Sequence, residues 1–422
     1  MPKMRTIALL FALLLASSAI AQNPDTYVDE EECGCDLYFI DGIQKTYKDG
    51  KFGFKRYDGK ILTPNKYIET DRFQNGYCKV WLDVGKCGLI DSSGREVIPC
   101  QYEDLDYFNC GLARFQQKYR FGFIDTANNI VIPATYVSAS AFFENLAVVS
   151  VIIDSIGSLA FGFIDKKGQM AIPAIYEYAY PFTEGVAVVK AYERYGFIDH
   201  NGKEVLPIKY EILGQMQNGY TFAVYNGEAA LIDKDMKPIT PFIYEDMQRV
   251  SEGMCAVKKN GLWGFINTKG KTIVPCKYEE VTSFKNGLAM VREEGRYGII
   301  NKKGRIVLPV EYGDANMRSN AYVLCDGLAL VEKDGKYGFV NEKGKIVIPL
   351  KYTNAYPFSE GLAAVRDGAL WGFIDTTGKM VIPVLYETAS YFNSGRAEVV
   401  KNGIIHMINK DGKCVKNCKK LR

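Results

Sequence analysis

The chain has 422 residues, of which 47% are apolar and 24% are charged, as in an ordinary globular protein. Its 52 Lys and Arg residues nearly balance 49 Asp and Glu residues, which excludes a polycation built to neutralise nucleic-acid phosphates. The 2 histidines leave little room for histidine-rich metal or acid–base sites. The 40 glycines, 28 tyrosines and 23 phenylalanines indicate short strands joined by tight turns.

Residues 1–21 have the three regions of a secretory signal peptide. Lys3 and Arg5 give it a positive start, an apolar run over residues 6–15 follows, and Ala19-Ile20-Ala21 is a small-residue cleavage site. The apolar run is shorter than the roughly 20 residues of a membrane-spanning helix. We therefore expect cleavage after Ala21 and a secreted or periplasmic mature chain without a transmembrane segment.

One motif then repeats along the chain, as in Trp263-Gly264-Phe265-Ile266-Asn267. Its glycine recurs at steps of 35, 34, 40, 34, 34, 34, 34, 40 and 34 residues. The period is therefore 34 residues, with six-residue insertions near residues 154–157 and 316–320, and ten repeats fill residues 51–400. We call the glycine position the anchor, and it is held by Gly53, Gly88, Gly122, Gly162, Gly196, Ala230, Gly264, Gly298, Gly338 and Gly372.

Each repeat is predicted to be a three-stranded meander in an all-β fold. A Leu-Ala-x-Val strand turns through Asp-Gly or Asn-Gly into the anchor strand. An Asp or Asn three residues before a glycine then gives a type I turn. The third strand ends in proline, and a tyrosine follows three residues later in all ten repeats. Because so short a unit cannot bury its apolar face alone, neighbouring repeats must stack into a continuous core.

The motifs around Trp263-Gly264 and Trp371-Gly372, with the following Pro-x-x-Tyr, resemble the WG-repeat (KWG-repeat) family of bacterial proteins. The resemblance covers roughly residues 52–409. Most repeats place Tyr or Phe where the family has tryptophan, and Cys87 and Ala229 stand there in two more. The resemblance implies an extracytoplasmic or surface-associated repeat array with no generally assigned catalytic activity, and it carries over no catalytic residue.

The number and size of the repeats favour an open solenoid or superhelix, because a propeller usually has four to eight blades of four strands. Propeller-like closure is the alternative. Residues 22–50 are predicted to cap the N-terminal end, beginning with an acidic stretch. Residues 401–422 are predicted to be a degraded repeat, with His406 at the anchor, followed by a basic cap. Head-to-tail association of chains through these opposite charges is a further hypothesis.

The chain has eleven cysteines, which is not an even number, and we expect it to reside in an oxidising compartment. Cys100 and Cys276 share one repeat position and Cys78 and Cys255 share another, which indicates small residues in core positions. The cysteines that lie outside the regular array are the candidate disulfide residues, and they are Cys33, Cys35, Cys414 and Cys418. Zinc binding is an alternative for these cysteines, but the four ligands at C-x₂-C spacing that would indicate it are missing.

The tyrosines after the prolines are the candidate binding row. If they are exposed, their rings could stack on sugars or anchor proteins. If they are buried, they belong to the core, with each hydroxyl satisfied by a neighbouring repeat. Nucleic acid is not an expected partner, because no basic stripe accompanies the rings. The row consists of Tyr176, Tyr210, Tyr244, Tyr278, Tyr312, Tyr352 and Tyr386.

The turn aspartates do not point to catalysis, because Asn267, Asn301, Asn341 and Asn409 replace them in four repeats. We expect no catalytic residue, cofactor or metal site, since no phosphate loop or Ser-His-Asp set is present. The sequence thus predicts a secreted, non-enzymatic protein-interaction or surface scaffold module whose partner is a protein of the cell envelope or surface. The alternatives are a polysaccharide or peptidoglycan binder that uses the tyrosine rows, and a hydrolase on a propeller-like ring.

Overall fold

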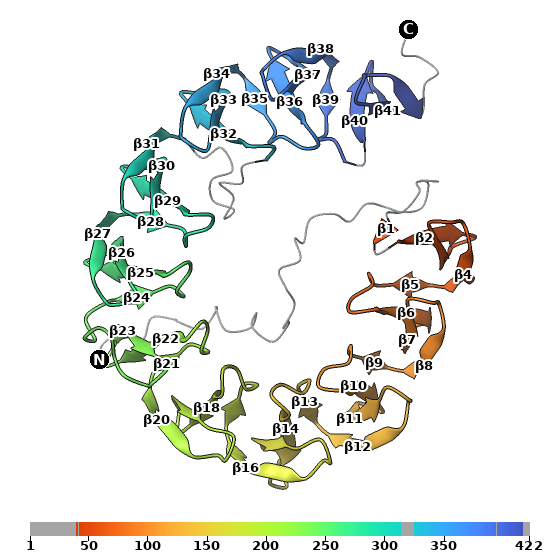
Figure 1. Cartoon of the computed structure of the whole chain (residues 1–422), viewed down its shortest axis with the longest axis vertical. Helices are drawn as coiled ribbons and strands as arrows, with labels where there is room; N and C mark the ends of the chain where they lie inside the picture. The colour runs from red at the N-terminus through yellow and green to blue at the C-terminus, as the bar shows by residue number, and fades with distance from the viewer. Residues whose placement is uncertain (1–38, 41, 314–324, 394, 417–422) are drawn as a thin grey trace. The chain divides into compact units, whose positions relative to one another are not determined.

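The computed structural model describes residues 39–40, 42–313, 325–393 and 395–416. The predicted signal peptide and Cys33, Cys35 and Cys418 lie outside these residues. The chain divides into two compact parts, Met1–Ala134 and Thr135–Arg422. Within the described residues the fold is all-β, and eleven small antiparallel sheets follow one another along the chain (Figure 1).

The sheets are built from short strands. The strands up to the junction of the two parts are β1 (Phe39–Ile40), β2 (Ile43–Lys48), β3 (Lys51–Arg56), β4 (Ile61–Tyr67), β5 (Glu69–Thr70), β6 (Tyr77–Asp83), β7 (Lys86–Asp91), β8 (Glu96–Tyr102), β9 (Asp104–Leu105), β10 (Leu112–Gln117), β11 (Arg120–Asp125) and β12 (Ile130–Tyr136). Those that follow are β13 (Ser138–Ala139), β14 (Ala147–Ile152), β15 (Leu159–Ile164), β16 (Met170–Tyr176), β17 (Tyr178–Ala179), β18 (Ala187–Ala191), β19 (Arg194–Ile198), β20 (Glu204–Tyr210), β21 (Ile212–Leu213), β22 (Tyr220–Tyr225), β23 (Glu228–Asp233), β24 (Asp246–Met247), β25 (Met254–Lys259), β26 (Leu262–Asn267), β27 (Thr272–Tyr278), β28 (Glu280–Val281), β29 (Leu288–Glu293), β30 (Arg296–Asn301), β31 (Ile306–Tyr312), β32 (Leu328–Lys333), β33 (Lys336–Asn341), β34 (Ile346–Tyr352), β35 (Asn354–Ala355), β36 (Leu362–Asp367), β37 (Leu370–Asp375), β38 (Met380–Tyr386), β39 (Thr388–Ala389), β40 (Arg396–Lys401), β41 (Ile404–Asn409) and β42 (Cys414–Lys416).

The three predicted strands are confirmed in every repeat except that of Ala230, and most sheets gain a fourth strand of two residues. In the sheet β35–β36–β37–β38, this strand is Asn354–Ala355, which pairs with Arg366 and Val365 on β36. It comes from the stretch after the tyrosine, where the sequence analysis predicted no strand. The predicted N-terminal cap contains β1 and β2 of the first sheet, and the predicted degraded repeat contributes β41 and β42 to the last sheet, β39–β42.

The anchor glycine lets the last strand of a sheet cross closely over the strand before it. A Cβ at Gly264 would lie 2.5 Å from the carbonyl oxygen of Val274 and 2.6 Å from the nitrogen of Cys276. Ala230 holds this position in the sheet β21–β22–β23, which has three strands. There two isolated bridges, Ala229 with Tyr244 and Ile232 with Pro238, replace the regular last strand. The methyl group at the anchor accounts for this loss.

The core lies between successive sheets. Leu328, Leu330 and Phe339 of one sheet pack with Ala363 and Val365 of the next. Each sheet therefore has two apolar faces, which we call the leading face, toward the preceding sheet, and the trailing face, toward the following one. Burial between repeats is what stabilises units this small.

The two terminal sheets differ from the others on one face each. By strand register, the leading-face positions of the first sheet hold Gln44, Thr46 and Lys55 where the other repeats have mainly apolar residues. The trailing-face positions of the last sheet hold Arg396 and Glu398. Polar outer faces are what the terminal units of a repeat array need for solubility.

Acidic side chains join neighbouring repeats of the second part. The carboxylate of Glu184 accepts hydrogen bonds from the backbone nitrogens of Asn218 (2.6 Å) and Gly219 (2.7 Å), one repeat further along. Glu184 itself has a φ of 53°, in the left-handed region that costs a non-glycine residue about 1–2 kcal/mol. The same contact to a glycine nitrogen of the next repeat is made by Glu144, Glu252, Asp326 and Glu360.

The Asp-x-x-Gly segments are turns, as predicted. Oδ1 of Asp165 accepts hydrogen bonds from the nitrogens of Lys167 and Gln169, both at 2.9 Å. Asn267 makes the same pair of bonds to Lys269 and Lys271, both at 3.0 Å. The exchange of Asp for Asn along the row is therefore explained by turn geometry alone.

Candidate functional site

The seven tyrosines of the candidate binding row are buried in the core. All are less than 9% exposed, and they pack between successive sheets, as Tyr352 does in the cluster that contains Phe358. Burial raises the pKa of Tyr176, Tyr210, Tyr244, Tyr312 and Tyr386 above the ordinary value. Their faces are not accessible to a sugar ring in this structure, so the predicted role that fits them is that of core residues.

Two equivalent tyrosines outside the candidate binding row show how the hydroxyl is satisfied. Tyr67 donates to Oε1 of Glu96 at 3.3 Å, and Tyr102 donates to Oδ1 of Asn128 at 3.1 Å. Both acceptors belong to the following repeat. The hydroxyl thus links one repeat to the next, as the sequence analysis expected for buried rings.

The cysteines divide into two groups. Cys414 is disulfide-bonded, while its partner lies outside the described residues, so the disulfide set of Cys33, Cys35, Cys414 and Cys418 stays a prediction. Seven cysteines of the described residues are free thiols, namely Cys78, Cys87, Cys100, Cys110, Cys255, Cys276 and Cys325. Burial raises the pKa of Cys78 and Cys255 to about 12 and that of Cys87 and Cys100 to about 11.

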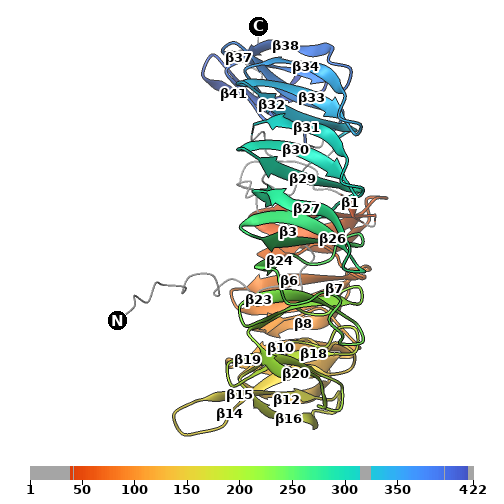
Figure 2. The ribbon, with the colours of Figure 1, turned by 90° about the vertical axis from the view of Figure 1, so that its left-hand side faces the viewer.

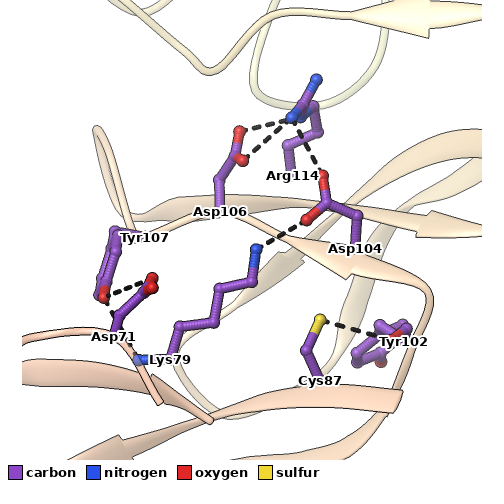
Figure 3. Close-up of polar contacts among 8 residues, drawn as sticks. All are labelled: Asp71, Lys79, Cys87, Tyr102, Asp104, Asp106, Tyr107 and Arg114. Atoms are coloured by element: carbon purple, nitrogen blue, oxygen red, sulfur yellow. Dashed lines mark hydrogen bonds and ion pairs between the residues drawn. The ribbon is translucent and has the colours of Figure 1, made fainter. Parts of the chain in front are cut away.

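A group of charged side chains lies between two successive sheets of the first part (Figure 3). Nζ of Lys79, on β6, donates a 2.7 Å hydrogen bond to Oδ1 of Asp104, on β9. The guanidinium of Arg114, on β10, lies 3.5 Å from Oδ2 of Asp104 and 2.8 Å from Oδ2 of Asp106. We call Lys79, Asp104, Asp106 and Arg114 the charge cluster.

Tyr107 extends the charge cluster to Asp71. Its hydroxyl donates to Oδ2 of Asp71 at 3.3 Å and accepts a hydrogen bond from the backbone nitrogen of Lys79 at 3.3 Å. Beside them, Sγ of Cys87 donates to the carbonyl oxygen of Tyr102 at 3.4 Å. The two sheets are thus joined through both backbone and side-chain groups.

The two carboxyls at the ends of this network have opposite pKa shifts. Burial raises the pKa of Asp71, against the opposing charge of Lys79. Burial acts in the same direction on Asp104, but the hydrogen bond and charge of Lys79 outweigh it, so the pKa of Asp104 lies below its ordinary value. Burial also raises the pKa of Tyr107 well above its usual range, so its hydroxyl stays a donor.

The sequence analysis missed the charge cluster, although the repeats contain a signal for it. Lys79 and Arg114 occupy the third position of the Leu-Ala-x-Val strand, on the trailing face. Val188, Met290 and Leu330 hold that position in later repeats and are buried there. Cations at a position that is apolar in most interior repeats would have marked these two repeats as different.

The arrangement is suited to holding sheets together, because Asp104 and Asp106 are engaged by cations of the same cluster. Among the described residues, no group of three or more His, Cys, Asp or Glu side chains could hold a metal ion. An enclosed cavity lined by Gly214, Thr221 and Leu231 has a volume of about 10 Å³, which is room for no more than one water molecule. The part of the chain that the structure describes holds no helix with the length and apolarity needed to span a bilayer.

These features define a tandem β-repeat protein whose repeats are joined by buried aromatic rings, carboxylates and a charge cluster. The family model described as "WG containing repeat" matches nine stretches, at residues 88–120, 121–151, 161–192, 195–228, 231–263, 263–297, 297–337, 337–371 and 371–403. These stretches cover more than half of the chain, and the protein belongs to the WG-repeat family.

Solved structures give only distant likenesses. The crystal structure of BamB from Moraxella catarrhalis is 12% identical, with a TM-score of 0.34, over 66% of this chain and 95% of that one. A crystal structure of the eukaryotic initiation factor is 11% identical, with a TM-score of 0.34, over 81% and 95%. The WD40 β-propeller domain of Doa1 is 10% identical, with a TM-score of 0.24, over 53% and 88%. At scores this low, neither function nor repeat arrangement is transferred. No curated protein matches the chain by sequence.

Proposed function

We propose that this WG-repeat protein is a secreted or periplasmic, non-enzymatic scaffold that binds a protein of the cell envelope or surface. The observation that carries the proposal is the last strand of the sheets. Its first residue is apolar and exposed in many repeats. These residues are Ile61, Ile130, Met170, Ile306, Ile346 and Met380.

These exposed apolar residues, each at the start of a last strand, form their most regular row in the second part of the chain. Ile306, Ile346 and Met380 begin β31, β34 and β38 of three successive sheets and are 36–57% exposed. Apolar side chains that recur on one surface are typical of protein interaction sites. Pro349 and Pro383 lie within β34 and β38 at the sheet edges, and proline cannot donate to an added strand. We therefore infer that the partner binds to the side chains and not by strand addition.

The other functions considered have less support. Glycan binding through the tyrosine row would require rings that are buried here. A hydrolase would require two free acids in one cleft. Asp71 and Asp104 have the divergent pKa shifts that an acid pair would show, but Asp104 is already paired with Lys79. The charge cluster therefore supports a structural role more than a catalytic one.

The experiment compares capture by matched variants of the immobilised chain that begins at Gln22. The test variant is Ile306→Ser, Ile346→Ser and Met380→Ser. The control is Glu204→Ser and Thr272→Ser, at the same strand position in repeats without an apolar residue there. Envelope extract is passed over each chain, in portions digested first with protease or with glycosidases.

The proposal expects one protein to be captured reproducibly by the parent and the control, and to be lost with the test variant and after protease digestion. Capture that survives protease but not glycosidases would reject the protein partner in favour of a glycan. Equal capture by the test variant and the parent would show that the row of last-strand residues is not the binding surface.

A further inference from the structure

The first six-residue insertion forms a protruding hairpin. It joins β14 (Ala147–Ile152) to β15 (Leu159–Ile164), and Figure 2 shows it extending beyond the neighbouring strands at the lower left. We call residues 152–159 the hairpin tip. The equivalent hairpin of the second repeat has one extra residue, and the other repeats have none.

The hairpin tip is strongly apolar. Ile153 and Ile156 are 61% and 89% exposed, and Ile152 and Leu159 are also exposed. Asp154 is the one residue of the tip that carries a charge. Polar residues at these four exposed positions would cost the fold nothing. The four large aliphatic side chains found there therefore indicate that another surface covers them.

Four backbone nitrogens of the tip donate hydrogen bonds within the tip. Ile153 N donates to Ser158 O at 2.9 Å. Ile156 N and Ser158 N donate to Oδ1 of Asp154 at 3.1 and 2.8 Å, and Gly157 N donates to Asp154 O at 3.4 Å. A lipid environment offers no partners for backbone groups, so a segment that enters it must pair them internally. The four bonded nitrogens of the tip meet this condition, and the remaining backbone groups of the turn would stay at the level of the polar headgroups.

The next repeat presents a tyrosine from its equivalent hairpin. Tyr192, between β18 and β19, is 92% exposed and has a φ of 51°. Later repeats place Asn226, Asn260 and Asn402 in this conformation, which asparagine adopts more readily than a bulky residue. Because both hairpins join the same two strands of successive sheets, they lie at the same end of those sheets. Tyrosine is enriched where apolar and aqueous phases meet.

The charges around Tyr192 are paired with one another. Lys190 lies 2.6 Å from Glu193 and 3.7 Å from Glu177, and Arg194 lies 3.0 Å from Glu211. This end of the two sheets therefore has no excess of positive charge that would select anionic lipids. Attachment here must depend on apolar contact.

We propose that the hairpin tip, supported by Tyr192, inserts into the interfacial layer of a lipid bilayer. Ile153 and Ile156 reach the boundary between headgroups and acyl chains, and Asp154 stays at the level of the headgroups. The depth is that of a peripheral anchor, about 5–10 Å, and the chain does not cross the membrane. The inference goes beyond the proposed scaffold function and places that scaffold at a membrane surface.

The experiment measures binding of the chain that begins at Gln22 to phosphatidylcholine vesicles, by co-sedimentation. The test variant is Ile153→Asp with Ile156→Asp. The matched control is Ile175→Asp, on β16 of the same sheet, where the side chain is 68% exposed but is not at the tip. Tyr192→Asn tests the second hairpin with a residue that suits its backbone. Thermal unfolding of each variant verifies the fold.

We expect the parent and Ile175→Asp to bind equally, the tip variant to lose roughly tenfold or more in partitioning, and Tyr192→Asn to lose less. Replacing part of the lipid by phosphatidylglycerol, or adding salt, should change binding little. A tryptophan at the tip, Ile156→Trp, should show a blue-shifted emission with vesicles. Absence of vesicle binding, an equal loss in Ile175→Asp, or a photocross-linker at position 156 that captures only a protein would overturn the proposal.

Discussion

Nζ of Lys79 on β6 lies 2.7 Å from Oδ1 of Asp104 on β9, and this contact joins two successive sheets at a position that is apolar in most later repeats. The lysine side chain is 14% exposed, so the pair is only partly screened by water. The first part of the chain thus uses an ion pair where the second part uses packing.

Replacing Lys79 by Val, the residue of the equivalent position in two later repeats, tests this exchange. The single variant leaves Asp104 half-buried with only the more distant Arg114, and we expect it to lose about 1–3 kcal/mol in the free energy of unfolding. The double variant Lys79→Val with Asp104→Ala restores an apolar contact and should come within about 1 kcal/mol of the parent. Urea denaturation measures both, and additive losses would refute the pairing.

The Lys79–Asp104 ion pair should make the free energy of unfolding depend on pH. Since the folded-state pKa of Asp104 lies below its ordinary value, its contribution to stability is present at neutral pH and is lost as the pH falls below about 4. We expect Lys79→Val to weaken this acid-side loss. Urea midpoints measured across the acid range would show this difference. The same pH dependence of the midpoint in parent and variant would contradict the prediction.

The anchor glycine is tested by Gly264→Ala. The added Cβ would lie 2.5 Å from the Val274 oxygen, so β27 must move away, and we expect a loss of about 1–3 kcal/mol or more. Gly261→Ala is the control, because its Cβ would meet nothing within 4 Å and only the φ of 76° is unfavourable. Equal losses in urea denaturation would mean that the close crossing of β26 and β27 does not require glycine.

The sequence predicted the repeat, its three longer strands, its turns and the family, because these depend on patterns that recur every 34 residues. It did not predict the two-residue strands such as Asn354–Ala355, since so short a segment has no periodicity of its own. The missing strand beside Ala230 and the charge cluster at Lys79 were visible only as departures from the pattern. Their meaning depends on what faces them across the sheets, which one sequence does not state.

The buried thiols should make the protein sensitive to alkali. Because burial raises the pKa of Cys255 and Cys78 to about 12, their neutral forms stabilise the fold fully below pH about 9, and this contribution is lost as the pH rises toward 12. Circular dichroism against pH should show unfolding in this range. Cys255→Ala and Cys78→Ala together should shift that transition upward.

The same burial predicts slow thiol chemistry at pH 8. Cys78, Cys87 and Cys255 are fully buried, and the thiolate is the reactive form. A thiol reagent should label them only at the rate of unfolding, while the denatured chain reacts at once. Labelling of these three at the denatured rate in native buffer would show that the repeats open freely.

The carboxylate contacts between repeats are tested at Glu184. Glu184→Ala removes two hydrogen bonds to backbone nitrogens and should destabilise the second part by about 1 kcal/mol, a value reduced by solvent exposure. Glu184→Gln keeps one acceptor oxygen and should lose less. Hydrogen exchange at Asn218 and Gly219 would show the effect directly, and unchanged protection in Glu184→Ala would contradict it.

The polar residues on the outer faces of the terminal sheets bear on how such a chain can change its length. A repeat added before Thr46 and Lys55, or after Arg396 and Glu398, would have to stack on hydroxyl and charged groups, and removing such groups from water is unfavourable. A repeat copied between two interior sheets meets apolar faces on both sides. Duplication and deletion of repeats are therefore tolerated inside the array, while the two ends are inherited as fixed pieces.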